Sequence, residues 1–376
     1  MQAARTDGPP SPLGQVYRCA PGPWGELEYS RIVIEPPDEF LSADYHAAPT
    51  RWAFPGFDDA RLEQLWREAS LDPGQLQTLR NPQFRESTAT AIILHPPEEL
   101  VRSLSPEARA VIYNTLARLP GNPLQEEPFR FRAEMVDEWF ADSGLRDGVV
   151  AAIRNLLYRR GNSQLFSDPA LVLPLLPSPA ERVQFVKTLS RKSTLLLKVR
   201  VRPDSDLDTM AVYWGAGRRS KDVKPLLHSL ARHPGGMTID VVHLLPRFAR
   251  GLLYTYPSPA IPRSLAPDCH WTSMNFFNET PDGRFDDILQ VKRVLTRDYT
   301  EIKEAPAMGD LLLLSRPDGE VLHSCTYVAA DIVFTKNGQS HSNPWTLTTL
   351  PDLQAFYPSD PPLTVRVFRH RDAARP

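Results

Sequence analysis

Hydrophobic residues recur along the chain with two different periods, which indicate two kinds of secondary structure. From Leu195 to Val201 the apolar residues occupy every second position, which predicts a half-buried strand. After Asp58 and after Ser105 they recur every three or four positions, which predicts amphipathic helices. Ser178 begins a Ser-Pro-Ala-Glu sequence that is typical of a helix capping box. The chain therefore contains both helices and strands, and we predict an α+β fold.

The last third of the chain shows helix and strand patterns in a definite order. A helix is expected to begin at Cys269, where Asp268 can cap the first turn. Apolar, β-branched runs follow it and predict an antiparallel set of strands at 311–314, 322–329, 332–335 and 363–368.

Proline content suggests how the chain is divided. Four prolines lie within residues 257–267, and we place the start of a C-terminal module, 257–376, at this segment. The Pro- and Gly-rich residues 1–25 are expected to form an extended arm, and 26–256 an α+β region that could contain two subdomains. Within that region, the composition of 209–214 predicts a strand paired with the one before it.

Charge and cysteine content narrow the possible functions. The 43 basic and 45 acidic residues give a net charge of −2, whereas nucleic-acid binding usually requires a basic excess, so we expect no nucleic-acid partner. No segment approaches the ~18 consecutive apolar residues of a membrane span, and the first residues lack a secretory signal pattern. Secreted, periplasmic and cytoplasmic locations therefore stay open. Three cysteines make no disulfide framework, and no zinc-type spacing of Cys or His occurs, so we expect no cofactor.

The most reactive arrangement that the sequence suggests combines Cys269 with His323. A cysteine in the first helical turn lies where the helix dipole and free backbone N–H groups favour a thiolate. The same N–H groups could bind the oxyanion of a tetrahedral intermediate. His323 lies in a strand-like run, from which it could face the start of the helix and serve as the base.

Three motifs in this region resemble the NlpC-like cell-wall cysteine peptidases, a branch of the papain-like fold. They are Asp268-Cys269 at a helix start, Gly309-Asp310 before an apolar strand, and His323 on the following strand, 54 positions after the cysteine. The resemblance covers about 100 of the 376 residues. It implies a papain-like module in which Cys269 is the nucleophile and His323 the base.

A third polar residue should orient the imidazole, and the sequence offers three candidates. The offset typical of the family leads to Thr335, while Asn337 is a chemically better orienter and His341 could be reached by a longer strand. We favour Asn337 and leave the other two open. Trp271 and Cys325 could line a substrate groove, although both are also explained as core residues.

These observations lead to one principal hypothesis and two alternatives. The first is a cysteine peptidase or amidase that hydrolyses a peptide-type bond, and the resemblance extends this to peptidoglycan stem peptides. The second is an acyltransferase on the same fold. The third is a catalytically inactive binding or scaffold protein, which the weak hydrogen-bonding capacity expected of Thr335 favours. The sequence does not define the oligomeric state or a role for the first 250 residues.

Overall fold

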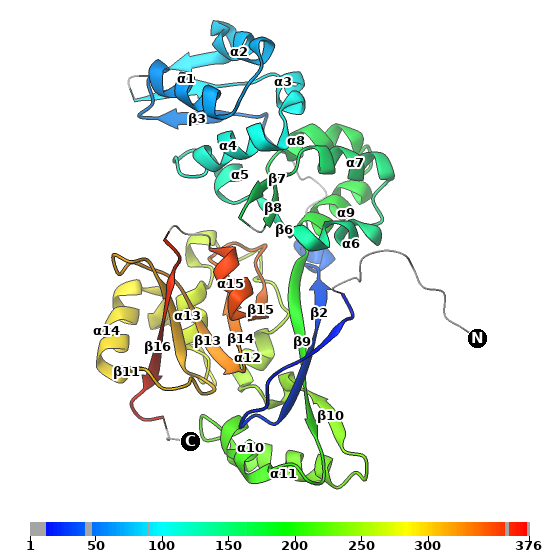
Figure 1. Ribbon diagram of the computed structural model, residues 1–376, viewed down its shortest axis with the longest axis vertical. Coiled ribbons are helices and arrows are strands. Elements are labelled where there is room, and N and C mark those ends of the chain that lie inside the picture. Colours follow the sequence, from blue (N-terminus) through cyan, green and yellow to red (C-terminus); the bar gives the residue numbers. More distant parts are fainter. Residues whose placement is uncertain (1–12, 42–46, 89, 162, 358–360, 374–376) are drawn as a thin grey trace, which may run out of the picture. The chain divides into compact units, whose positions relative to one another are not determined.

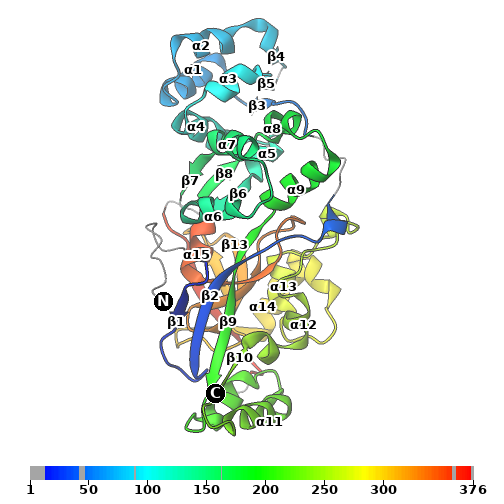
Figure 2. The same ribbon diagram turned by 90° about the vertical axis from the view of Figure 1, so that its right-hand side faces the viewer.

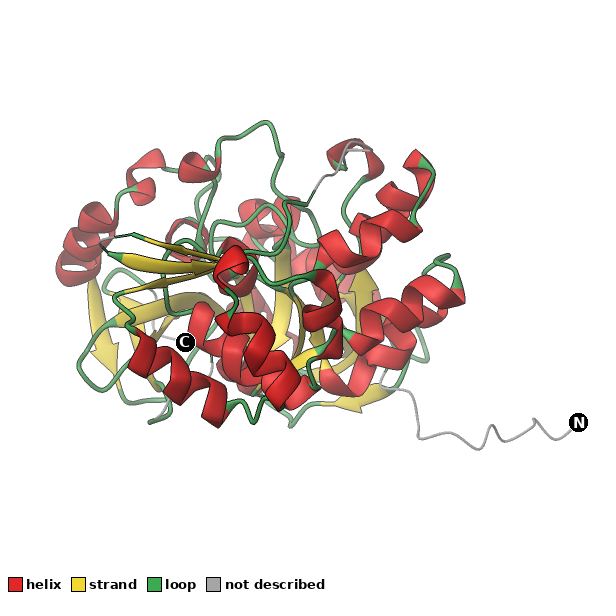
Figure 3. Ribbon diagram, turned by 90° about the horizontal axis from the view of Figure 1, so that it is seen from above, coloured by secondary structure: helices red, strands yellow, loops and turns green. Residues whose placement is uncertain are grey.

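The computed structural model describes residues 13–41, 47–88, 90–161, 163–357 and 361–373. The chain is an α+β protein whose named strands pair antiparallel throughout these residues. Helices and strands both occur along the chain, as Figure 3 shows. A helix able to span a bilayer is not found in the described ranges, because none has a sufficiently long apolar stretch.

The chain forms two compact units, and the first of them is discontinuous. Unit 1 comprises residues 1–40 and 191–376, and unit 2 comprises residues 41–190. The boundary expected at 257–267 does not separate compact units. Backbone hydrogen bonds join Tyr254 N to Trp345 O at 2.9 Å and Trp345 N to Thr255 O at 3.1 Å, across that proline-rich segment. The C-terminal module is therefore part of a larger unit.

The first sheet of unit 1 is built around a long pair of antiparallel strands. Nine consecutive pairs join its two central strands, from Glu26↔Arg200 to Ile34↔Lys192. The described strands of this sheet, in spatial order, are β1 (Val16–Arg18), β2 (Glu26–Ile34), β9 (Lys192–Val201) and β10 (Met237–Asp240). β9 confirms the strand expected from the alternating apolar residues.

Three helices that follow β9 in the sequence pack against its buried side chains. One apolar cluster includes Leu197 of β9 and Trp214, and it extends to Val328 and Phe334 of the second sheet. These helices are α10 (Leu207–Trp214), α11 (Ser220–Ala231) and α12 (Arg247–Leu252).

The strand expected at 209–214 is wrong, because this segment is the helix α10. Asp206 caps the helix by accepting a hydrogen bond from Thr209 N at 3.0 Å. The buried residues Met210, Tyr213 and Trp214 have helical spacing, three and four positions apart. Their β-branched and aromatic neighbours had suggested a strand, and the periodicity was the better guide.

The second sheet of unit 1 carries the candidate site. Its strands in spatial order are β11 (Tyr299–Ile302), β16 (Thr364–His370), β12 (Leu311–Ser315), β13 (Val321–Ala329), β14 (Ile332–Lys336) and β15 (Trp345–Thr349). Its helices are α13 (Cys269–Met274), α14 (Ile288–Asp298) and α15 (Leu350–Phe356). α13 and α14 lie against one face and α15 against the other (Figures 1 and 2).

The turn before β12 shows why the Gly-Asp sequence is needed there. Gly309 has φ of +93°, a conformation that favours glycine. Asp310 accepts a hydrogen bond from Ala307 N at 2.8 Å and forms an ion pair with Arg369 at 2.6 Å. These contacts fix the start of β12 beside β16, so the motif has a structural explanation.

Unit 2 combines two small antiparallel sheets with short helices. The described strands are β3 (Trp52–Pro55), β5 (Ala91–Leu94) and β4 (Arg85–Ser87) in one sheet, and β6 (Phe129–Arg132), β8 (Ser163–Phe166) and β7 (Tyr158–Arg160) in the other. The helices are α1 (Asp59–Glu68), α2 (Pro73–Arg80), α3 (Glu98–Ser103), α4 (Pro106–Leu116), α5 (Pro123–Glu126), α6 (Val136–Ala141), α7 (Asp147–Asn155), α8 (Pro169–Val172) and α9 (Pro179–Leu189). The helix starts expected after Asp58, Ser105 and Ser178 are confirmed.

Candidate active site

Cys269 occupies the first position of α13, as the sequence predicts. Asp268 precedes it in an extended conformation and accepts a hydrogen bond from Trp271 N at 2.7 Å. The short side chain of Asp268 thereby satisfies one of the unpaired N–H groups at the helix start. Cys269 is buried, with 7% of its surface exposed.

A chain of hydroxyl and imidazole groups connects α13 to β13. Ser273 Oγ donates to the carbonyl oxygen of Cys269 at 2.9 Å and lies 2.8 Å from Ser324 Oγ. Ser324 Oγ is in turn 2.9 Å from His270 Nδ1. Burial lowers the pKa of His270, which favours a neutral imidazole. The side chain of Ser324 therefore belongs to the face of the sheet that α13 covers.

His323 is held in a separate group of side chains. Its Nε2 atom is 2.7 Å from Thr335 Oγ1 on the neighbouring strand β14. Its ring packs against Tyr357, just beyond α15, with 4.8 Å between ring centroids. The residue is fully buried, and its Nδ1 atom has no hydrogen-bond partner. The imidazole is thus anchored through one nitrogen only.

α13, the helix that carries Cys269, and the imidazole of His323 lie on opposite faces of the sheet. Successive side chains of a strand alternate between faces, so His323 and Ser324 point in opposite directions. His323 pairs with Leu314, which packs in the cluster beneath α15, whereas Ser324 contacts α13. The expectation that His323 faces the start of the helix is therefore not met, and no hydrogen bond joins the two residues.

The three candidates for the orienting residue occupy different places. Thr335 contacts the imidazole, whereas Asn337, which we favoured, does not hydrogen-bond to it in the described part of the chain. The Oδ1 atom of Asn337 is buried and has no partner. His341 Nε2 is instead 2.8 Å from the carbonyl oxygen of Ile261. The family-type offset thus led to the residue that touches His323.

Cys325 is a core residue in this structure, and Trp271 is partly buried against the core. Cys325 is fully buried in the cluster beneath α15. Burial raises the pKa of its thiol, and the neighbouring Cys269 thiol raises it further. Trp271 packs on Phe248, with 5.2 Å between ring centroids. Neither arrangement resembles an open substrate groove.

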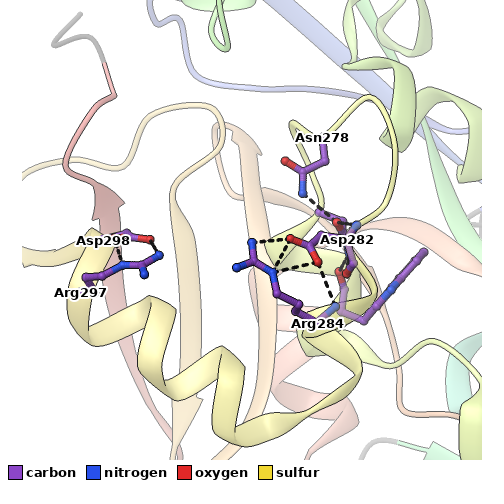
Figure 4. A network of polar contacts seen from close by, with 7 residues as sticks. Asn278, Asp282, Arg284, Arg297 and Asp298 are labelled. Carbon is purple, nitrogen blue, oxygen red and sulfur yellow. Dashed lines mark hydrogen bonds and ion pairs between the residues drawn. The ribbon is translucent and has the colours of Figure 1, made fainter.

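A polar network fixes the loop that follows α13. The side-chain oxygen of Asn275 accepts hydrogen bonds from Asp282 N at 2.7 Å and from Asn278 Nδ2 at 2.8 Å. Asp282 also forms an ion pair with Arg284 at 2.6 Å. Figure 4 shows Asn278, Asp282 and Arg284 within this network. Asn275 therefore positions the end of α13 and does not line a site.

Sequence reasoning missed the polar groups that do contact α13. The candidate residues taken from the sequence did not include His270, Ser273 or Ser324, which join α13 to β13. The spacing of three positions between His270 and Ser273 places both on one side of a helix, which is the signal that could have revealed them. Their partner Ser324 could not be found this way, because its contact depends on which face of the sheet α13 covers.

No cluster of His, Cys, Asp and Glu suited to a metal ion occurs among the described residues. Comparison of the chain with known protein families, curated proteins and solved structures gave no match.

Proposed function

We propose that the protein is a cysteine-dependent hydrolase of peptide-type bonds, with Cys269 as nucleophile and His323 as base. The observation that supports this most directly is the state of His323. Thr335 holds its Nε2 atom at 2.7 Å, while its buried Nδ1 atom has no partner. A general base requires an oriented imidazole with one nitrogen available, and this side chain meets both conditions.

The position of Cys269 provides the second support. The residue begins a helix that Asp268 caps, and the first turn of a helix carries backbone N–H groups without helical partners. Ser273, one turn further along α13, contacts Ser324, the residue next to His323. After burial, the Cys269 thiol is the second cause of the raised pKa of Cys325. The helix that carries the nucleophile therefore contacts the residue next to the base, on the opposite face of β13.

The chemistry would follow the general scheme for thiol hydrolases. His323 would take the thiol proton, the sulfur would attack the carbonyl carbon, and N–H groups at the start of α13 would stabilise the oxyanion. The imidazolium would then protonate the leaving amine, and water would hydrolyse the thioester. By the family resemblance, the substrate would be a stem or cross-bridge peptide of peptidoglycan.

This proposal requires a local change at the start of β13. The register of β13 against β12 shifts between Val321 and His323, which is a bulge next to the imidazole. Bulges of this kind often re-aim a side chain beside an active site. The pair would become productive only if the segment around Leu322 turned His323 toward the α13 face.

The position of His323 on the sheet face opposite α13 favours a second candidate function. If His323 stays on the α15 face, the module is catalytically inactive and the protein acts by binding. An acyltransferase would differ from the hydrolase only in its acceptor, and an added amine would reveal it through the product.

Alkylation of Cys269 by iodoacetamide distinguishes catalysis from binding alone. The rate is measured from pH 5 to pH 10 by peptide mass spectrometry in the wild type, in His323→Ala and in His341→Ala, the last being a matched control. Catalysis predicts fast alkylation below pH 8 that His323→Ala abolishes and His341→Ala preserves. Equal, slow alkylation in all three proteins would refute the catalytic proposal and leave binding as the remaining candidate.

Two internal references make this experiment easier to interpret. Burial raises the pKa of Cys19 to about 11, and it raises the pKa of Cys325 as well. Both thiols should therefore react slowly at neutral pH. Fast labelling of Cys325 in a variant would indicate that the sheet has opened. In that case Thr335→Val replaces the variant, because it removes the hydrogen bond to the His323 imidazole while valine keeps nearly the volume of threonine.

A further inference from the structure

Unit 2 contains a cavity that the chemistry of Cys269 does not involve. Its volume is about 280 Å³, close to the lower end of the ~300–1,000 Å³ range of small-molecule sites. Much of its wall is apolar, with Pro123, Leu124 and Pro169 among its residues. Arg51 and Gln125 also line it.

The side-chain amide of Gln125 has no structural partner. The residue is only 4% exposed, and its backbone N–H and carbonyl are bonded to Asn122 and Arg160. Its amide, however, forms no hydrogen bond to any residue that the structure describes. The amide atoms are not among the fully buried unpaired atoms of the described structure, so the amide is open to a partner in the cavity that Gln125 lines. A ligand in the cavity would supply the missing partner.

Arg51 brings a positive charge to the edge of the same cavity. Its guanidinium donates to the carbonyl oxygen of Gly121 at 3.1 Å, and it forms no ion pair within the described ranges. The carboxylate of Asp168, which also lines the cavity, forms a buried ion pair with Arg109, although its Oδ2 atom accepts no hydrogen bond in the described structure. Arg109 lies 3.5 Å from one of its oxygens, and Tyr113 donates to the other at 2.6 Å. Arg51 is therefore the uncompensated charge at this site.

We infer that this cavity binds a small carboxylate with a peptide-like body, namely an acylated amino acid with an apolar side chain. Arg51 pairs with the carboxylate, since guanidinium groups bind carboxylates through parallel hydrogen bonds. Gln125 can donate to and accept from the amide of the acyl group. The apolar side chain of the ligand packs against Leu124 and the prolines. This site does not depend on the proposed reaction at Cys269.

Titration calorimetry of the full chain with N-acetyl-L-leucine tests this inference. We expect saturable binding by the wild type and much weaker binding of the uncharged N-acetyl-L-leucine methylamide. Arg51→Gln should weaken binding about tenfold or more, the scale of one charge-assisted contact, and Arg51→Lys should restore part of it. Gln125→Glu keeps the size of the side chain and adds charge repulsion, so it should weaken binding to a similar extent.

The matched control is Arg67→Gln, which removes an exposed arginine of α1 that does not line the cavity. Its affinity should equal that of the wild type. The inference is overturned if the wild type shows no saturable binding, if the methylamide binds as tightly as the acid, or if Arg67→Gln weakens binding as much as Arg51→Gln. None of these outcomes involves the thiol, so the reaction proposed for Cys269 is tested separately.

Discussion

The hydrogen bond between His323 and Thr335 can be removed with almost no change in side-chain volume. Thr335→Val replaces the hydroxyl that lies 2.7 Å from Nε2 by a methyl group. Both residues are fully buried, so water does not reach the imidazole. Because the Nδ1 atom already lacks a partner, the substitution leaves the ring with no hydrogen bond at all.

Thr335→Val should lower the free energy of unfolding, because no other group replaces the lost hydrogen bond. A buried polar group left without a partner costs about 1–3 kcal/mol, and we expect about 2 kcal/mol for Thr335→Val. Thr346 offers a matched control, because it pairs directly with Thr335 across β14 and β15 and is 6% exposed. Its hydroxyl has no hydrogen-bond partner in the described part of the structure. Thr346→Val should therefore cost no more than about 0.5 kcal/mol.

Amide hydrogen exchange measures the difference in stability between the two variants in β13 and β14, the strands that carry His323 and Thr335. Protection of peptides from β13 and β14 gives the free energy of opening of this sheet, even if the two units unfold separately. We expect Thr335→Val to lower that free energy and Thr346→Val to leave it nearly unchanged. Equal loss of protection in both variants would refute the reasoning, because the histidine contact would then contribute nothing beyond ordinary packing.

Three further predictions concern the rest of the chain. Burial raises the pKa of Asp168 to about 6 from its ordinary 3.8, so the folded state binds this proton more tightly than the unfolded state. The stability of unit 2 should accordingly fall as pH rises from 4 to 6, and Asp168→Asn should remove this dependence in thermal unfolding measured across that range. Gly309→Ala should destabilise unit 1 by about 1–3 kcal/mol in chemical denaturation, because a Cβ atom there would have a positive φ and would lie 2.1 Å from Phe277. Ser178→Ala should cost about 1 kcal/mol in the same assay, through loss of the capping box of α9, whereas Ser178→Asp should not.

Local features of the fold could be predicted from the sequence because neighbouring residues determine them. Helices begin after Asp58, Ser105 and Asp268 as expected, and each of these residues caps its helix by accepting a hydrogen bond from an N–H group three residues away. The alternation in β9 and the Gly-Asp turn before β12 are equally local. The segment at 209–214 failed because its composition and its periodicity disagreed, and composition was given more weight.

The arrangement of the candidate site could not be predicted, because it depends on distant segments. Strand alternation shows that His323 and Ser324 point to opposite faces, but it does not reveal which face α13 covers. The packing of Tyr357 on His323 depends on α15, a helix that no sequence pattern had predicted. In unit 2, the pairing of Arg109 with Asp168 joins residues far apart in the chain and carries no sequence pattern. Such contacts are decided by tertiary packing.

The interruption of unit 1 by unit 2 has a consequence for the order of folding. Glu35 and Arg191 form an ion pair at the end of the β2–β9 pairing, although 156 positions separate them. If residues 41–190 were still unfolded, closing this loop would cost roughly 2 kcal/mol more than closing a connection of about ten residues. We therefore expect unit 2 to fold first, before β2 pairs with β9. The assembly rate of the sheet that contains β9 would then be set by a part of the chain that contributes no strand to it.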